Sequence, residues 1–231
     1  MPGADDPIDP SPDAGVPLRR TPRQARSREK LARVLEAADR LLVAEGAEAL
    51  TTTRVAAEAG VSVGALYQYL PDRDAIVDTL ADGYLTRLET LMDSFIDRAT
   101  RETWPDPVAV LVDAFADLYR AEPGLRALWF GHYLTEHTRE ADRTHKRAMA
   151  AGVHRILVAQ RLLPDNAATA AACQTAFLAA DAVIQEAFRA DPEGAAALLE
   201  HLKTMLGSYL ETLTGTAKKQ GDHTLPATLN V

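Results

Sequence analysis

The chain has 231 residues, of which 47% are hydrophobic, so it can bury a sizeable core without disulfides or structural metals. Its single cysteine, Cys173, excludes an internal disulfide framework and any site built on paired cysteines, and it favours a reducing compartment. The first residues combine prolines with acids where a signal peptide needs basic residues and an apolar run. No stretch looks long and apolar enough to span a membrane. We therefore expect a soluble, cytoplasmic protein.

The net charge of −8 is unevenly distributed along the chain. Residues 19–33 contain seven basic side chains and one acid, a net charge of +6, which leaves −14 for all other residues. Such asymmetry is typical of a small basic module, suited to nucleic acid, joined to an acidic body. The alternative is a solvated linker and charged helix face, and charge alone does not decide between the two.

The chain reads as helical from end to end once its N-terminal tail is passed. Residues 1–18 are rich in proline and aspartate and lack periodicity, so we expect them to be disordered. Apolar residues then recur at helical spacing, and Gly or Pro falls near most of the breaks. The expected helices cover residues 24–44, 51–59, 63–69, 72–98, 108–119, 125–133, 138–160, 167–188 and 194–213. Residues 215–231 look loose.

Residues 50–76, LTTTRVAAEAGVSVGALYQYLPDRDAI, have the pattern of a helix-turn-helix. Ala56, Ala59 and Gly60 supply small side chains where two short helices would cross. Gly60 also permits the positive φ that a tight turn between helices often needs. The outward face of the 63–69 helix is small at its leading edge, so its backbone can enter a DNA major groove closely.

This stretch resembles the TetR (tetracycline-repressor-like) family of one-component regulators over about residues 26–86. The family pattern I-A-x-x-A-G-V-S followed by x-G-x-L-Y-x-H-F corresponds here to VAAEAGVS and VGALYQYL, and its x-x-K-x-x-L corresponds to PDRDAI. Tyr69, Leu70 and Arg73 stand where histidine, phenylalanine and lysine are common. Each replacement keeps the physical role of the residue that it replaces.

The resemblance implies an all-α protein with an N-terminal three-helix helix-turn-helix DNA-binding domain and a C-terminal helical ligand-binding and dimerisation domain. The implied divisions are a disordered tail 1–18, a DNA-binding domain with basic arm 19–75 with its motif at about 51–70, a regulatory domain 76–214, and a loose tail 215–231. The implied function is a DNA-binding transcriptional regulator, a repressor that a small-molecule effector releases from a palindromic operator. No cofactor or metal is expected.

The resemblance also implies residue roles at the DNA. Hydroxyl and basic groups near helix N-termini would bind phosphates, and Gln68 would pair with adenine while Val63 touches a thymine methyl. The predicted DNA-binding residues are Arg19, Arg20, Arg23, Thr52, Thr53, Arg54, Ser62, Val63, Gly64, Ala65, Tyr67, Gln68, Tyr69 and Arg73. Thr52, Ser62 and Arg73 can also be ordinary helix caps and surface charge, and the two roles can hold at once. Core packing is the alternative for Tyr67.

In the regulatory part, residues 167–188 and 194–213 have wide apolar faces, which predict a homodimer through a two-fold four-helix interface that includes Leu206 and Leu210. Aromatic and neighbouring side chains on several helices are candidates for an effector cavity, with a packed core as the alternative. These candidates are Met92, Phe95, Phe115, Tyr119, Trp129, His132, Tyr133 and Phe177. Asp181 lies near this apolar face as a ligand partner, an interface charge or a residue offset from the stripe.

Other classes of function find less support in the sequence. No phosphate-binding loop, nucleophile motif or paired-carboxylate motif is present, so an enzyme is not expected. His132, Glu136, His137, Glu140 and His145 gather in sequence, but their spacing favours a polar, solvated segment over a metal site. Cys173 falls in an apolar stripe and is predicted to be an inert core thiol. A DNA-binding protein that responds to no ligand is the remaining alternative.

Overall fold

The computed structural model describes residues 25–131 and 133–221, and within them every regular element is a helix. The elements are α1 (Ala25–Glu45), the short 3-10 helix η1 (Ala47–Ala49), α2 (Thr52–Glu58), α3 (Val63–Leu66), α4 (Arg73–Ala99), α5 (Pro107–Ala121), α6 (Pro123–Trp129), α7 (Glu136–Ala159), α8 (Ala167–Ala190) and α9 (Ala196–Gly221). The predicted all-α fold is confirmed.

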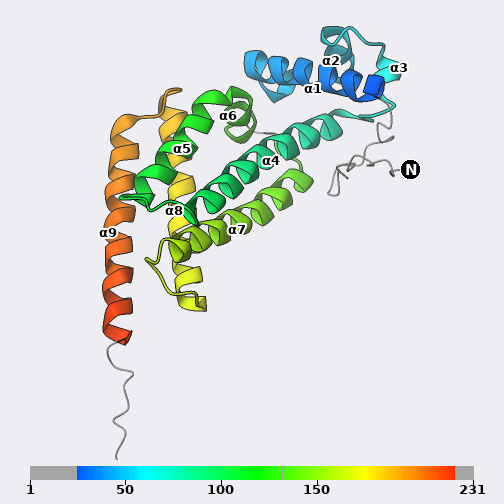
Figure 1. Ribbon diagram of the computed structural model, residues 1–231. Coiled ribbons are helices and arrows are strands. Elements are labelled where there is room, and N and C mark those ends of the chain that lie inside the picture. The colour runs from blue at the N-terminus through cyan, green and yellow to red at the C-terminus, as the bar shows by residue number, and fades with distance from the viewer. Residues whose placement is uncertain (1–24, 132, 222–231) are drawn as a thin grey trace, which may run out of the picture.

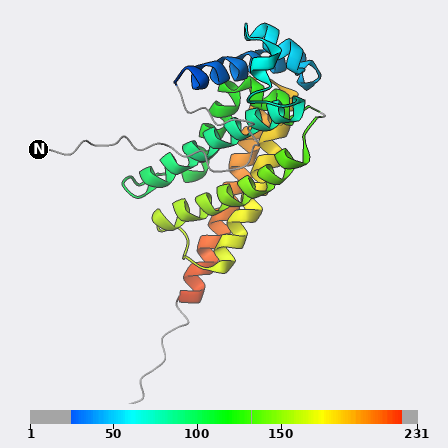
Figure 2. The same ribbon diagram turned by 90° about the vertical axis from the view of Figure 1, so that its right-hand side faces the viewer.

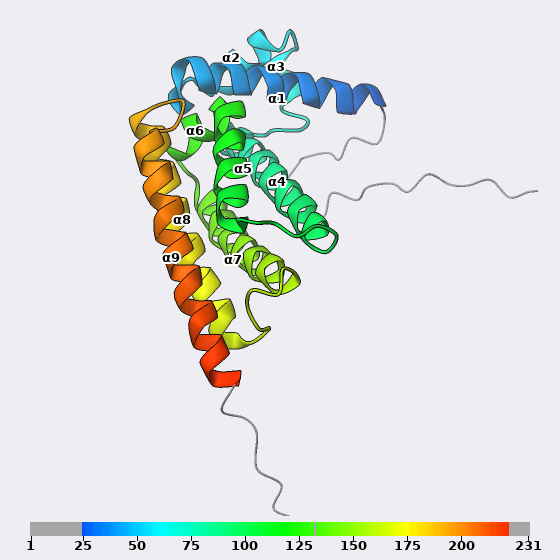
Figure 3. The ribbon, with the colours of Figure 1, turned by 60° about the vertical axis from the view of Figure 1, so that its left-hand side comes forward.

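The helices form a small head and a larger bundle. Helices α1, α2 and α3 make the head at one end of the molecule, and α4 leads from the head into the bundle beside α7 (Figure 1). Helices α8 and α9 lie side by side along one flank of the bundle (Figure 3). A second view shows that the end of α9 points away from the head (Figure 2).

Polar side chains fix where the helices begin. Thr51, Ser62 and Asp72 each accept a hydrogen bond from the backbone N–H three residues further on, at 3.3, 3.2 and 2.8 Å. These bonds satisfy amide groups that the first helical turn leaves without a partner. Such a cap therefore defines the residue at which each of α2, α3 and α4 begins.

Three helices differ by three or more residues from a predicted end. Helix α6 ends at Trp129, four residues early, and it starts at Pro123, two residues early, because a proline is well tolerated in the first turn of a helix. Helix α3 ends at Leu66, since the chain turns there and buries Tyr69 and Leu70. Helix α9 continues to Gly221, so the expectation that the chain is loose from residue 215 is wrong for residues 215–221. The tail 1–18 and the basic arm lie outside the described residues.

One hydrophobic core runs through the head and most of the bundle. It includes Val34, Leu66 and Ile76 in the head region and continues to Leu128 and Leu202. Since helix α1 also packs on α4 and α6, the head and the bundle share buried surface instead of being joined by a bare linker. Movement in one is therefore expected to strain the other.

The prediction that no segment is long and apolar enough to span a membrane is wrong for helix α8. By length and composition alone its 24 residues could cross one, and 17% of its most apolar stretch is buried within the described part of the chain. A single helix of this kind is weak evidence for a membrane span, and α8 packs against both α7 and α9.

Candidate DNA interface and effector pocket

The turn between α2 and α3 has the geometry of a helix-turn-helix. Gly60 adopts φ 64°, a left-handed conformation that suits glycine, and Val61 N–H donates to the Ala56 carbonyl at 3.0 Å. Val55, Ala56 and Leu66 are almost completely buried beneath the turn. The small core thus holds the two short helices at a fixed angle.

Several predicted DNA-binding residues on α2, on α3 and just after α3 are exposed, and these residues are called the outer face of the head. Thr53, Gly64 and Gln68 are exposed, and so is Tyr67, whose side chain remains 38% exposed although it is large and hydrophobic. The Tyr67 hydroxyl lies 3.3 Å from Thr52 Oγ1, which joins α2 to the end of α3. A Cβ placed on Gly64 would meet no atom within 4 Å. This face therefore presents polar groups around a position where another backbone can approach closely.

Other predicted contacts have partners within the protein. Arg54 forms two hydrogen bonds with the Glu45 carboxylate, at 2.9 and 2.6 Å. Ser62 caps α3, while Val63 and Ala65 are half-buried and Val63 packs against the core. An exposed ion pair such as Arg54–Glu45 contributes little to stability, so Arg54 can exchange its partner for a phosphate at small cost.

Tyr69 and Arg73 do not lie on the outer face. Tyr69 is 5% exposed and belongs to the hydrophobic core, so the prediction that it contacts DNA is wrong in this structure. Arg73 donates to the Ala47 carbonyl at 2.7 Å, and its guanidinium lies 3.8 Å from the centre of the Tyr133 ring. Arg73 therefore ties the head to the bundle, a role that the motif did not reveal.

A second polar contact also joins the head to the bundle. Tyr84 of α4 donates a hydrogen bond to Asp39 of α1, and Gly124 of α6 packs so closely that an added Cβ would overlap both groups. The ring of Tyr84 in turn meets Trp129 of α6 edge to face, with centroids 6.3 Å apart. Helices α1, α4 and α6 are thus held by groups that leave little free space.

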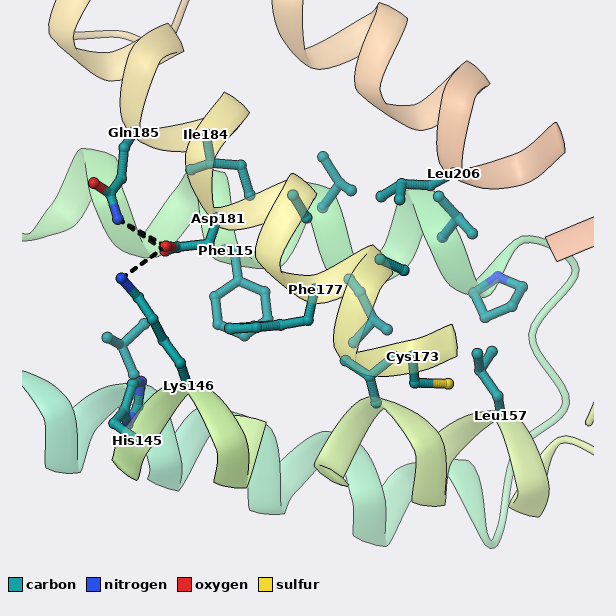
Figure 4. Close-up of a pocket in the computed structure, with 18 of the residues that line it drawn as sticks. Phe115, His145, Lys146, Leu157, Cys173, Phe177, Asp181, Ile184, Gln185 and Leu206 are labelled. Atoms are coloured by element: carbon teal, nitrogen blue, oxygen red, sulfur yellow. Dashed lines mark hydrogen bonds and ion pairs between the residues drawn. The ribbon is translucent and has the colours of Figure 1, made fainter. Parts of the chain in front are cut away.

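The bundle contains an apolar cavity with a volume of about 120 Å³, to which all of the helices α4 to α9 contribute. Leu85 and Leu88 reach it from α4, and Phe115 and Phe177 line it from α5 and α8 (Figure 4). Leu206 lines its α9 side. The cavity has the mostly apolar wall that is typical of small-molecule sites.

A polar cluster lies at one end of the cavity. Lys146 Nζ is 2.8 Å from Asp142 Oδ2 on its own helix and 3.1 Å from Asp181 Oδ2 on α8. Gln185 donates to both Asp181 oxygens at 3.0 and 2.9 Å, and Trp129 Nε1 donates to Asp142 at 3.1 Å (Figure 4 shows the contacts of Asp181). Burial alone would lower the pKa of Lys146, but its bonds and charge interactions with Asp142 and Asp181 raise it, so the amine stays protonated.

The effector prediction is partly supported. Phe115, Tyr119, Trp129 and Phe177 do line the cavity. Burial, and then the charges of Asp181 and Asp142, raise the pKa of Tyr119, so its hydroxyl remains a hydrogen-bond donor.

The other predicted effector residues lie elsewhere. Met92 and Phe95 belong to a separate cluster with Trp104 and Met149, so their assignment to the cavity is wrong. They follow the same stripe of α4 as Leu85 and Leu88, but further along the helix, where α7 covers them. The assignment of Tyr133 to the cavity is wrong as well, because its hydroxyl donates to Asp74 at the junction with the head. His132 lies outside the described residues.

The histidine-rich segment and Cys173, which the sequence analysis also considered, can be located in the structure. Within the described ranges, no three or more His, Cys, Asp or Glu side chains gather as a metal site. His145 is 5% exposed with Nδ1 3.0 Å from Glu89 Oε1, so the expectation of a wholly solvated segment is wrong at this residue. Cys173 is buried against the cavity, and burial raises the pKa of its thiol to about 11, which agrees with an unreactive cysteine.

Comparisons with known proteins fit this geometry. Residues 34–80 match the family of bacterial regulatory proteins called the tetR family, and residues 102–214 match the tetracyclin repressor-like C-terminal domain. The chain belongs to the TetR family. It is a DNA-binding transcriptional regulator by family and fold, and neither its fold nor its family is that of an enzyme.

Individual TetR relatives share either a segment or the whole fold. A TetR-family regulator from Streptomyces coelicolor is 25% identical, with a TM-score of 0.59 over 81% of this chain and 98% of that one. A TetR regulator from Haloarcula marismortui is 18% identical, with a TM-score of 0.61 over 80% and 98% of the two chains, which shows a shared fold. The nucleoid occlusion factor SlmA of Pasteurella multocida is 33% identical over 112 residues, or 46% of this chain and 53% of that protein. The chain spans about half the length of such curated relatives.

The TetR pattern could not indicate the polar end of the cavity, because that pattern ends near residue 86. Two signals were nevertheless present in the sequence. Asp142 with Lys146, and Asp181 with Gln185, each have the i, i+4 spacing that puts two side chains on one helix face. That these two faces meet depends on how α7 packs against α8, which no local pattern encodes.

Proposed function

We propose that this transcriptional regulator is a homodimeric repressor that leaves a palindromic operator when a small molecule fills the bundle cavity. The observation that carries the proposal is the course of α4. This helix begins at Arg73, beside the outer face of the head, and lines the cavity with Leu85 and Leu88. A ligand that pushes on α4 would therefore act on both regions at once.

Helix α6 gives the cavity a second connection to the head. Trp129 lines the cavity and packs against Tyr84, which is bonded to Asp39 of the head. Packed contacts of this kind shift as units because they have little room to deform. Met92 and Phe95, which were expected to line the cavity, lie outside its wall and are not part of this route.

The dimer is proposed through α8 and α9. Leu178 of α8 and Met205 of α9 are 47% and 46% exposed, and Leu198 is also exposed, which is unusual for large apolar side chains. Leu206 and Leu210, which the sequence analysis expects at this interface, are less exposed and line the cavity. A two-fold axis on this flank would pair the two heads for successive half-sites, about 34 Å or a longer matched spacing apart.

The DNA contacts proposed for the head are those of its outer face. Gln68 and the Gly64 backbone would approach base edges, while Thr52, Thr53 and Tyr67 would bind phosphates. Arg19, Arg20 and Arg23 would add phosphate contacts from the arm. The regulator works in the cytoplasm in this proposal, as DNA binding requires.

The test begins with selection of an operator from a pool of random DNA duplexes, using the full-length protein. A small-molecule library is then screened for compounds that lower the fluorescence anisotropy of the labelled operator. The proposal expects a selected palindrome, bound by a dimer, and compounds whose release of DNA is abolished by Phe177→Trp, which fills the cavity. Compounds that release DNA equally well from the filled variant would refute the cavity as the effector site. An operator that no compound releases would favour a regulator that responds to no ligand.

A further inference from the structure

The polar end of the cavity carries more negative than positive charge. Asp142 and Asp181 both face Lys146, so two carboxylates share one ammonium group. The neighbouring pair of His145 and Glu89 adds no net positive charge, whether or not the imidazole is protonated. The cluster therefore has a net charge of −1 or lower where it borders the cavity.

This charge is largely removed from water. The side chains of Asp142 and Asp181 are each only 19% exposed, and that of Lys146 is 24% exposed. Figure 4 shows Asp181 and Lys146 meeting beside the rings of Phe115 and Phe177. A partly buried charge without a full counter-charge is costly, so a positive group brought in by a ligand would relieve that cost.

An anionic ligand would meet the opposite situation. Lys146 already has both carboxylates as partners, and the Gln185 amide already donates to Asp181. A ligand carboxylate placed here would be a third negative group in a region of low dielectric, where like charges repel strongly. Lys146 thus does not make the cavity a site for fatty acids or other organic acids.

The remaining wall suits a hydrophobic cation. The rings of Phe115, Tyr119, Trp129 and Phe177 contribute to the lining from three helices. Aromatic faces attract ammonium groups as well as hydrocarbon, and the attraction increases when the cation is desolvated. Negative charge at one end and aromatic rings along the wall therefore favour the same class of molecule.

We propose that the cavity binds an apolar amine, with its ammonium group beside the net negative cluster of Asp142, Lys146 and Asp181 and its hydrocarbon body among the aromatic rings. This inference rests on the proposed function only in taking the cavity as the effector site. It specifies the charge of the effector, which the family and the fold do not.

The test uses three probes that share a phenylethyl body and differ at one end. Phenethylamine carries a positive charge, phenethyl alcohol none and hydrocinnamate a negative charge. Binding of each to the full-length dimer, without DNA, is measured by calorimetry. We expect phenethylamine to bind about tenfold more tightly than the alcohol, as one favourable charge interaction allows, and hydrocinnamate to bind most weakly.

Two variants change the charge that the ligand meets. Asp181→Asn leaves one carboxylate for one ammonium, so the preference for phenethylamine over the alcohol should nearly vanish. The double variant Asp142→Asn with Asp181→Asn leaves Lys146 alone, so hydrocinnamate should become the tightest of the three. Asparagine keeps the size and an acceptor oxygen of each side chain, and thermal melts check that the variants fold. The matched control is Asp93→Asn on the exposed side of α4, which should change nothing.

Three results would overturn the inference. The first is hydrocinnamate binding wild-type protein as tightly as phenethylamine does, and the second is an unchanged order of the probes in the folded double variant. The third is that no probe binds at millimolar concentration. If the order of the probes is as expected but none of them releases operator DNA, the inference on charge stands and the proposed function fails.

Discussion

The head and the cavity arrange their polar groups in opposite ways. In the head, Thr53, Tyr67 and Gln68 lie outside over a small apolar core, free to meet a large charged partner. In the bundle, Lys146 and Asp181 are mostly buried at one end of the cavity. The first arrangement suits recognition of a surface and the second recognition of a shape and a charge. The two regions nevertheless share α4 and one hydrophobic core.

The largest effect is expected from breaking the proposed dimer, because operator binding requires two heads whereas ligand binding requires only one cavity. Leu178→Asp together with Met205→Asp places two charges on the exposed flank of α8 and α9. Mass photometry or light scattering should then report monomers, and operator affinity should fall by at least about a hundredfold because the two half-sites no longer act together. The cavity should still bind phenethylamine.

The control for this pair is Val43→Asp on α1, because Val43 is 44% exposed and thus matches the two interface residues. This variant should remain dimeric. A double variant that stays dimeric at micromolar concentration would contradict an interface on α8 and α9.

A smaller effect is expected from the basic arm, which concerns the head alone. Deletion of residues 1–23 should lower operator affinity about tenfold at physiological salt, and the salt slope should fall by roughly 0.9 for each phosphate that the arm no longer neutralises. The preference for operator over random DNA should change little. Anisotropy titrations across a series of salt concentrations measure both quantities. An unchanged slope would mean that Arg19, Arg20 and Arg23 bind no phosphate.

The connection between the two regions can be weakened without altering either surface. Tyr84→Phe removes the hydroxyl that donates to Asp39, at a cost of about 1–3 kcal/mol in unfolding free energy because a partly buried carboxylate is left without its partner. Affinities for operator alone and for ligand alone should change little. The factor by which ligand weakens operator binding should fall several-fold. If this factor is unchanged, α4 alone connects the cavity to the head.

The smallest change is expected at Gly64, where space is open to DNA but not needed for packing. Gly64→Ala should raise the unfolding free energy by about 0.5–1 kcal/mol, since alanine favours helix and its Cβ meets no atom. Operator affinity should fall a few-fold as the added methyl group meets the groove. Chemical denaturation and anisotropy measure the two effects. Higher stability with unchanged affinity would show that α3 does not approach DNA at Gly64.

The sequence predicted the head better than the cavity for a physical reason. A helix-turn-helix is encoded locally, by a cap at Ser62, a glycine at position 60 and small residues at the crossing, all within a short stretch. Even there, the prediction that Tyr69 faces outward was wrong, because the course of the chain after α3 depends on the core beneath it. The direction of Arg73 depends likewise on Tyr133, which lies far along the chain.

The cavity is encoded by packing between helices that are distant in sequence. Phe115 and Phe177 were predicted as cavity candidates because they are aromatic residues of this region, and they do line it. Periodicity could not show that Met92 lies beyond the end of the cavity, since it shares a stripe with Leu88. It also left the role of Asp181 open, because that role depends on Lys146 of another helix.

The central claim is that ligand binding in the cavity and operator binding by the outer face of the head are energetically coupled. It is tested most directly by titrating phenethylamine into the dimer, free and saturated with operator, in a calorimeter. Linkage requires the operator to weaken amine binding by the same factor by which the amine weakens operator binding, and a coupling of about 1–3 kcal/mol would make that factor roughly 5 to 150. The account predicts a reduced affinity of the operator-bound protein for the amine. Equal affinity in the two states would contradict it.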